Sequence, residues 1–121
     1  MRVNKLFAFT VIVLILVISG CSKRSQITSF QGPIETIRTS VNEILVDCTD
    51  AVNKNKKGSI NTIAYIFTVQ LDEDSKIIGK NNEHLSIGDL KEKIEIEVIF
   101  SNPIYIDETR IGTAKEVRVL E

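Results

Sequence analysis

Histidine, cysteine, proline and tryptophan are scarce in this chain, and their scarcity excludes several kinds of site. The 121 residues contain one histidine, two cysteines, two prolines and no tryptophan. A structural zinc site takes four closely spaced cysteine or histidine ligands, so this chain cannot build one. The sequence also lacks a glycine-rich phosphate loop, a nucleophile elbow and a histidine-dependent triad. We therefore expect no catalytic residue, no bound metal and no cofactor.

The chain has no large excess of positive or negative charge. The chain carries 15 lysines and arginines against 16 aspartates and glutamates, a formal charge of −1. Nucleic-acid-binding domains are normally strongly basic, so we expect no nucleic-acid partner. A length of 121 residues allows one small domain and excludes a multi-domain enzyme.

One long hydrophobic run is present, and it lies near the start of the chain. Residues 6–18 are apolar except for Thr10, and Arg2 and Lys5 precede them. A basic start followed by an apolar run of this length is typical of an export signal, whereas a membrane-spanning helix needs about 20 apolar residues. We expect residues 1–20 to be a signal peptide.

A cysteine follows this run directly. Ile18-Ser19-Gly20-Cys21 resembles the lipobox of bacterial lipoproteins, which predicts cleavage between Gly20 and Cys21 and diacylglycerol on the Cys21 thiol. Two acyl chains give stable anchoring, so we expect a protein on the extracytoplasmic face of the cell membrane. Residues 21–28 then form the lipidated cysteine and a polar linker, and the exported part has 13 basic and 16 acidic side chains, a charge of −3. An uncleaved membrane anchor with an incidental cysteine is the alternative.

Alternation of apolar and polar residues predicts that residues 29–121 are mostly β-structure. In residues 93–100 the even positions are apolar, and Glu95 and Glu97 lie on the opposite, solvent-facing side. The expected strands are 30–38, 42–48, 63–71, 93–100 and 115–120, with weaker extended pieces at 76–78 and 104–106.

Turn-forming residues separate these strands. We expect a long polar loop at 51–61, an acidic turn at 72–75, a tight turn at Gly88-Asp89 and a strand end at Asn102-Pro103, because proline cannot donate to a ladder. Five antiparallel strands joined in this way predict a small OB-like β-barrel. A small β-sandwich is the alternative.

Several residues have both a functional and a structural interpretation. Cys48 is expected to be a small buried hydrophobic residue, and a dyad with the single histidine, His84, is the catalytic alternative. Asp72-Glu73-Asp74 is predicted to be a solvated turn. A calcium site is the alternative, but the segment lacks the ligand spacing of a calcium loop.

A lysine-rich loop supports one binding hypothesis. Lys54, Lys56 and Lys57 precede Tyr65 and Phe67 of the third expected strand, and OB-folds bind ligands on a strand face flanked by loops. These five residues are the candidate ligand site for an anionic cell-envelope polymer or for lipid headgroups. A solubilising loop is the simpler interpretation.

The order of these features resembles the YobA-like family of small lipoproteins from Firmicutes. The similarity lies behind the lipobox, and it covers the chain from Phe30 to Leu120. Its segments are Phe30-x-Gly32-x-Ile34, Ile44-Leu45-Val46, Leu85-Ser86-Ile87-Gly88-Asp89, Ile94-x-Ile96-x-Val98 and Ala114-Lys115-Glu116-Val117-Arg118-Val119-Leu120. The resemblance implies a lipid-anchored protein with an OB-like domain, and it implies no particular activity.

Three functions remain compatible with the sequence. The first is a non-catalytic, membrane-anchored binding module of the cell envelope, whose ligand the sequence does not identify, with an envelope polymer as one candidate. The second is a lipoprotein that docks on another envelope protein, and the third, least supported, is a hydrolase.

Overall fold

The structure is a computed structural model, and it describes residues 26–54 and 64–121. The expected signal peptide, Cys21, Lys56 and Lys57 lie outside the described residues. The described chain begins at Gln26, and the first strand starts at Ile27, so β-structure begins inside the expected linker.

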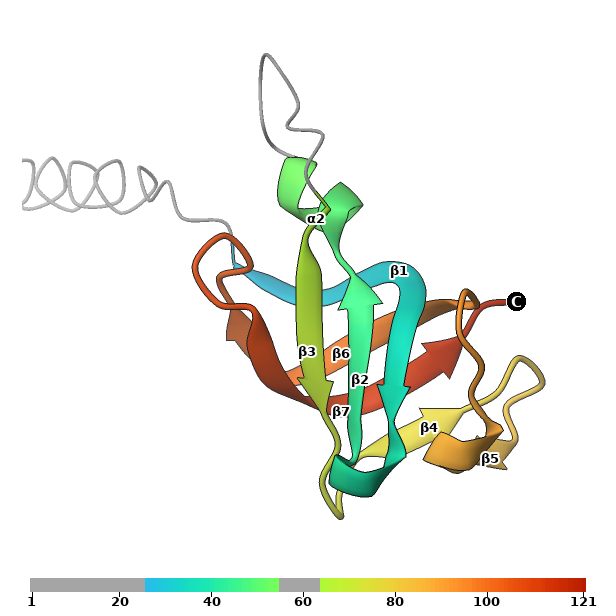
Figure 1. The fold of residues 1–121 in the computed structure, drawn as a ribbon. Coiled ribbons are helices and arrows are strands. Elements are labelled where there is room, and N and C mark those ends of the chain that lie inside the picture. The colour runs from blue at the N-terminus through green and yellow to red at the C-terminus, as the bar shows by residue number, and fades with distance from the viewer. Residues whose placement is uncertain (1–25, 55–63) are drawn as a thin grey trace, which may run out of the picture.

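Seven strands and three short helical segments follow one another along the described chain (Figure 1). They are β1 (Ile27–Arg38), η1 (Thr39–Val41), β2 (Glu43–Asp47), α2 (Thr49–Asn53), β3 (Ile66–Gln70), β4 (Lys76–Ile78), β5 (His84–Leu85), η2 (Ile87–Asp89), β6 (Glu95–Ile104) and β7 (Ile111–Val119).

Five of these strands close into a barrel. The hydrogen-bonded ring runs β1-β2-β3-β7-β6 and returns to β1, which is the strand order of an OB-fold. The OB-like barrel is therefore confirmed, and the sandwich alternative does not apply because β3 and β7 join the two sheets. Closure removes exposed strand edges from the ring. The β4–β5 hairpin extends from β7 outside it, at lower right in Figure 1.

The expectation of a purely antiparallel sheet is wrong at two pairings. β3 and β4 each pair with β7 in parallel. Alternation within a strand reports which residues face the core, but it carries no information on the direction of the neighbouring strand.

Local predictions succeeded best where alternation was regular. All five main strands exist, and β4 has the predicted bounds. Residues 49–53 form the helix α2 where a loop was expected from residue 51, because one helical turn is too short to produce a periodic pattern. Strand β6 continues through Pro103 to Ile104, where β6 has left β7 and the pairing with β1 is irregular, so the missing N–H breaks no regular ladder.

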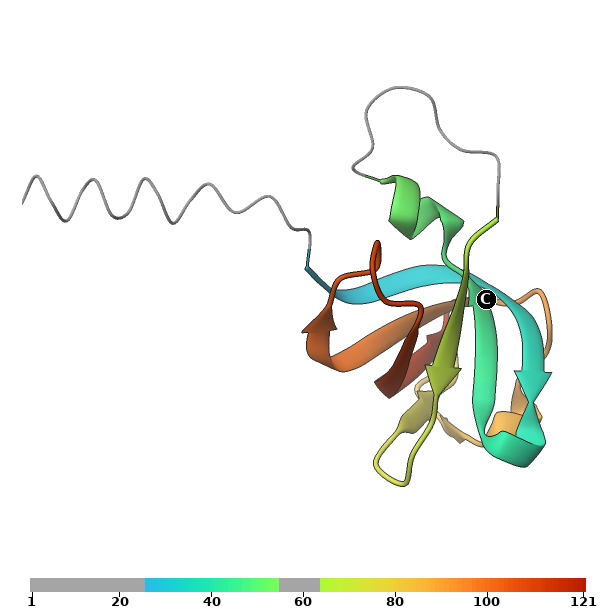
Figure 2. The same ribbon diagram turned by 60° about the vertical axis from the view of Figure 1, so that its left-hand side comes forward.

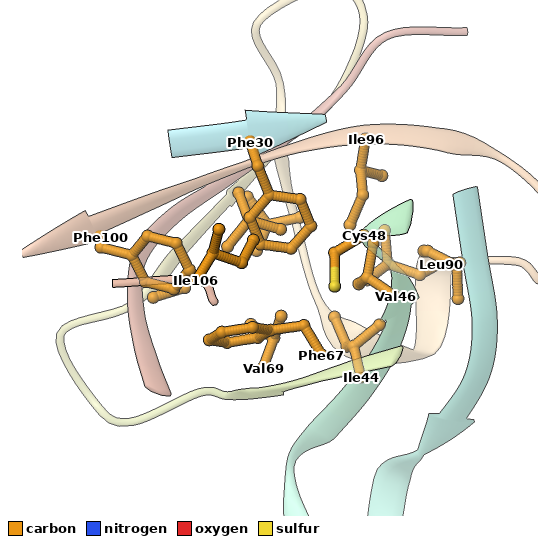
Figure 3. Packing of buried hydrophobic residues seen from close by; sticks show 14 of the residues in the cluster. Phe30, Ile44, Val46, Cys48, Phe67, Val69, Leu90, Ile96, Phe100 and Ile106 are labelled. Atoms are coloured by element: carbon orange, nitrogen blue, oxygen red, sulfur yellow. The ribbon is translucent and has the colours of Figure 1, made fainter. Parts of the chain in front are cut away.

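The barrel interior is filled by aliphatic side chains around three phenylalanines (Figure 3). The ring centroids of Phe30, Phe67 and Phe100 lie 5.3 to 5.9 Å apart, a separation at which aromatic pairs attract. They come from β1, β3 and β6, so their packing joins both halves of the ring.

Strand β1 changes partner close to Gly32, between Pro33 and Ile34. Residues up to Pro33 pair with β6, and residues from Ile34 pair with β2. A Cβ atom on Gly32 would fall on the backbone carbonyl oxygen of Asp47. Only glycine therefore permits β1 and β2 to approach this closely at the corner.

We predict that Gly32→Ala destabilises the barrel by at least about 2 kcal/mol, because backbone must move to admit the methyl group. Urea unfolding followed by circular dichroism measures the change. The matched control is Gly88→Ala, where the added Cβ meets only the Ser86 hydroxyl at 3.9 Å. Equal stability of the two variants would contradict the steric role of Gly32.

The turn before β6 is confirmed, but a serine and an aspartate hold it. Gly88 lies inside η2, and the Asp89 carboxylate accepts hydrogen bonds from the backbone N–H of Ser86 at 2.9 Å and from its hydroxyl at 3.0 Å. The Ser86 backbone N–H and then its hydroxyl lower the pKa of Asp89 below the usual 3.8.

This lowered pKa predicts an acid-sensitive contribution to stability. A depressed folded-state pKa stabilises the fold above the unfolded-state value and loses that effect as the pH falls through the folded-state value. We expect Asp89→Asn to be less stable than wild type at pH 7, with the difference shrinking once the pH falls below 3.8. Unfolding curves across this range measure it, and a pH-independent difference would contradict the electrostatic cause.

Candidate functional site

A groove of about 510 Å³ lies between α2 and strands β1 and β6. We call it the α2 groove. Its apolar lining consists of Ile27, Phe30 and Ala51, and its polar lining consists of Ser29, Gln31, Asp50, Lys54 and Glu97. Its volume falls within the range of sites for small molecules.

Local sequence explains how α2 comes to form one wall. The helix starts directly after β2, and its first N–H, from Thr49, donates to Asp47 Oδ1 at 2.9 Å. Val52 is buried in the core, which directs Asp50 and Lys54 toward the groove. Asp50 and Lys54 stand four residues apart, one helical turn.

The polar side chains of the α2 groove have no partners among the described residues. None of Ser29, Gln31, Asp50, Lys54 and Glu97 makes a side-chain hydrogen bond or ion pair there. Lys54 and the Gln31 amide donate hydrogen bonds, whereas the carboxylates accept them. The groove can therefore bind a ligand that carries both hydrogen-bond donors and acceptors.

A second polar cluster lies between the start of β3 and the β6–β7 loop. The Arg110 guanidinium stacks on the Tyr65 ring at 4.5 Å from the centroid, and its Nε donates to the Ile106 carbonyl oxygen at 2.7 Å. The Tyr65 N–H donates to Thr49 Oγ1 at 2.9 Å, so this cluster adjoins the first residue of α2.

Cys48 lies beneath this cluster and has no exposed surface. Burial raises the pKa of its thiol above 9.0, while the positive charge of Arg110 lowers it by less, so the thiol is protonated at neutral pH. His84 stands in β5, away from the α2 end of the barrel (Figure 1). The expectation that Cys48 is a buried hydrophobic residue is confirmed, and the Cys48–His84 dyad is absent.

We predict that Cys48 resists alkylation in the folded protein. Iodoacetamide reacts with thiolates, and this thiol is both buried and protonated. Peptide mass spectrometry after a brief treatment is expected to find unmodified Cys48, with full modification after urea denaturation. Rapid alkylation under native conditions would show an open path to the thiol that the structure lacks.

The structure separates the predicted ligand-binding residues. Lys54 lines the α2 groove, Tyr65 lies against Arg110, and Phe67 is a core residue with 0% exposure. The prediction of Phe67 as a ligand contact is corrected, because alternation along β3 turns its ring into the barrel. Lys56 and Lys57 lie outside the described residues.

The acidic residues have different environments. Glu97 lines the α2 groove, whereas Glu95 lies beside a separate hollow with Asp47 and Asp50. Asp72 accepts hydrogen bonds from the Asp74 N–H and the Ser75 hydroxyl within its turn. Across residues 26–54 and 64–121, no group of three His, Cys, Asp or Glu side chains is placed to hold a metal ion.

Sequence reasoning missed Ser29, Gln31, Asp50 and Arg110. The first two look like the solvent-facing residues of any amphipathic strand, and Asp50 fell at an expected loop boundary. Only one sequence feature distinguishes Arg110, its position as an isolated arginine after the acidic pair Asp107-Glu108.

No helix in the described part of the chain is long and apolar enough to cross a membrane.

Comparison with known proteins adds one structural similarity. Neither the protein-family comparison nor the search of curated proteins finds a match to this chain. A Cu(II)-bound variant of CusF from Escherichia coli is similar in structure, with 15% sequence identity and a TM-score of 0.45. The alignment covers 83% of this chain and 99% of that one.

Proposed function

We propose that this protein is a non-catalytic binding module of the cell envelope, held on the extracytoplasmic face of the membrane by diacylglycerol on Cys21. The α2 groove carries the binding part of the proposal. Unpaired polar groups over an apolar floor are the usual composition of a ligand site. The lipobox carries the anchoring part, and the resemblance to YobA-like lipoproteins supports the anchoring part only.

The groove favours a neutral, hydroxyl-rich ligand over a polyanion. Asp50 and Glu97 face the single cation Lys54 in its described lining, so a ligand with many negative charges would meet repulsion. Sugar hydroxyl and acetamido groups both donate and accept, and the ring faces fit an apolar floor. We therefore infer that the ligand is a glycan segment of the envelope.

The site lies near the proposed anchor. Cys21 stands five residues before Gln26, and an extended chain spans at most about 3.6 Å per residue. Cys21 is therefore within about 18 Å of Gln26, and Ile27, the next residue, lines the α2 groove. Such a short tether keeps the groove close to the membrane surface.

Lipidation is tested by metabolic labelling with an alkyne fatty acid. We expect the wild-type protein to take up label and to sediment with membranes, and Cys21→Ala to take up none. Wild-type protein that stays unlabelled and keeps residues 1–20 would disprove the anchor.

Binding is tested by chemical-shift titration of residues 22–121 with soluble muropeptides and with anionic wall polymer. We expect muropeptides to shift signals of Gln31, Asp50 and Glu97. The double variant Gln31→Ala/Glu97→Ala should bind at least about tenfold more weakly, since losing one hydrogen bond to a charged group already costs about 1.5–3 kcal/mol and about 1.4 kcal/mol is a tenfold change. Glu35→Ala is the matched control, exposed on β1 outside the groove. Unchanged spectra with every probe would contradict a glycan-binding groove.

Docking on an envelope protein is the second candidate, and one observation favours it. A hollow of about 490 Å³ lies between the β3–β4 turn and η2, and its lining includes Leu71, Ile77, Leu85 and Ile87. Apolar surface of this kind is common at protein interfaces.

A hydrolase has the least support. Cys48 is buried, and His84 stands in β5, away from the α2 end of the barrel where Cys48 lies (Figure 1).

A further inference from the structure

Arg110 differs from the other two arginines that the structure describes. Arg38 forms an ion pair with Glu43 at 3.8 Å, and Arg118 forms one with Glu116 at 2.6 Å. No described carboxylate lies within ion-pair distance of Arg110, although Arg110 is partly buried. Charged side chains are almost never fully buried unless they are paired, and Arg110 is partly buried without a carboxylate partner.

The position of the Arg110 guanidinium is nevertheless well defined. Stacking on Tyr65 fixes the plane of the group, and the hydrogen bond from Nε to Ile106 fixes its rotation. The guanidinium also hydrogen-bonds to the Cys48 thiol, and its remaining N–H groups donate to no oxygen of the described residues. The N–H groups of an arginine lie in one plane, an arrangement that can match two oxygens of a phosphate group.

The surroundings of Arg110 provide no ion-pair partner. Cys48, the thiol next to Arg110, is protonated at neutral pH and contributes no negative charge. Asp47 carries a negative charge close enough to act on this thiol, but no ion pair joins it to Arg110. Asp107 and Glu108 share the β6–β7 loop with Arg110, and no ion pair joins either of them to it.

We propose that the Arg110 guanidinium, held in place by Tyr65 and Ile106, binds a phosphate group. This site is distinct from the α2 groove and would take phosphomonoesters or phosphodiesters. Two envelope components carry such groups, membrane lipids and glycerol-phosphate polymers. The lipid source rests on the proposed anchor at Cys21, whereas binding of free phosphate does not.

The β6–β7 loop lies beside the point where the described chain begins (Figure 2). Ile27 pairs with Ile104, and Gln26 Nε2 donates to the Tyr105 hydroxyl at 2.9 Å. A lipid on Cys21 would therefore hold this loop close to the membrane as well, with Arg110 within reach of headgroup phosphates.

The test is a titration of the full-length protein in detergent micelles with inorganic phosphate, followed by the side-chain N–H signals of the arginines. We expect a saturable shift of the Arg110 signal and no comparable shift for Arg38 or Arg118. Arg110→Gln should abolish the saturable shift, and the matched control Arg118→Gln, which removes an ion-paired arginine, should leave binding unchanged. Arg110→Lys keeps the charge but loses the planar guanidinium, so we expect binding about tenfold weaker.

Two results would overturn the proposal. One is phosphate binding by Arg110→Gln equal to wild type, and the other is equal loss in Arg110→Gln and Arg118→Gln, which would mean non-specific attraction. Arg110→Gln could unfold the protein, which the loss of a dispersed amide spectrum would show. In that case Arg110→Lys tests the proposal. Phosphate affinity equal to wild type in Arg110→Lys would contradict recognition by the planar guanidinium.

The phosphate source is resolved with two further probes. The lipidated protein is placed in nanodiscs of phosphatidylcholine with and without phosphatidylglycerol, or mixed with soluble poly(glycerol phosphate). A shift of the Arg110 signal with only one of these identifies the source. Free-phosphate binding without response to either probe would reject both envelope sources and overturn the envelope role of this site.

Discussion

The close contact between β1 and β2 at Gly32 is the constraint on which the rest of the structure depends. Because Gly32 has no side chain, the backbone of β1 can lie against the Asp47 carbonyl group and then exchange β6 for β2 as its partner. That exchange allows the ring to close through β3 and β7. The same contact positions the end of β2, and hence α2, beside β1. The α2 groove is therefore a direct consequence of how the barrel closes.

Most of the barrel could be predicted from the sequence, since each strand carries its own alternating pattern. The pattern of Ile94, Ile96, Val98 and Phe100 needs no knowledge of neighbouring strands. Closure could not be predicted in this way, because the parallel pairing of β3 with β7 joins segments 43 residues apart, as at Thr68 and Ile111. The helix α2 was missed because its five residues are too few for a helical period to show in the sequence.

The candidate sites were less predictable than the fold. A run of lysines drew attention to Lys54, which does line the α2 groove, but Gln31 and Glu97 become neighbours only through the β1–β6 pairing. Before that pairing is known, each is an ordinary solvent-facing residue. Arg110 is recognisable only by what surrounds it, namely the Tyr65 ring and the absence of a described carboxylate partner.

The two clusters at the α2 end differ in how their charges are balanced. In the α2 groove, cationic Lys54 stands with Asp50 and Glu97, so the groove suits a ligand without net charge. Beside Arg110, burial raises the pKa of the Cys48 thiol, which keeps the thiol neutral. A thiolate there would neutralise the guanidinium. Desolvation of Cys48 by the core therefore preserves the positive charge of Arg110, and the packing that stabilises the barrel also sets the electrostatics of its surface.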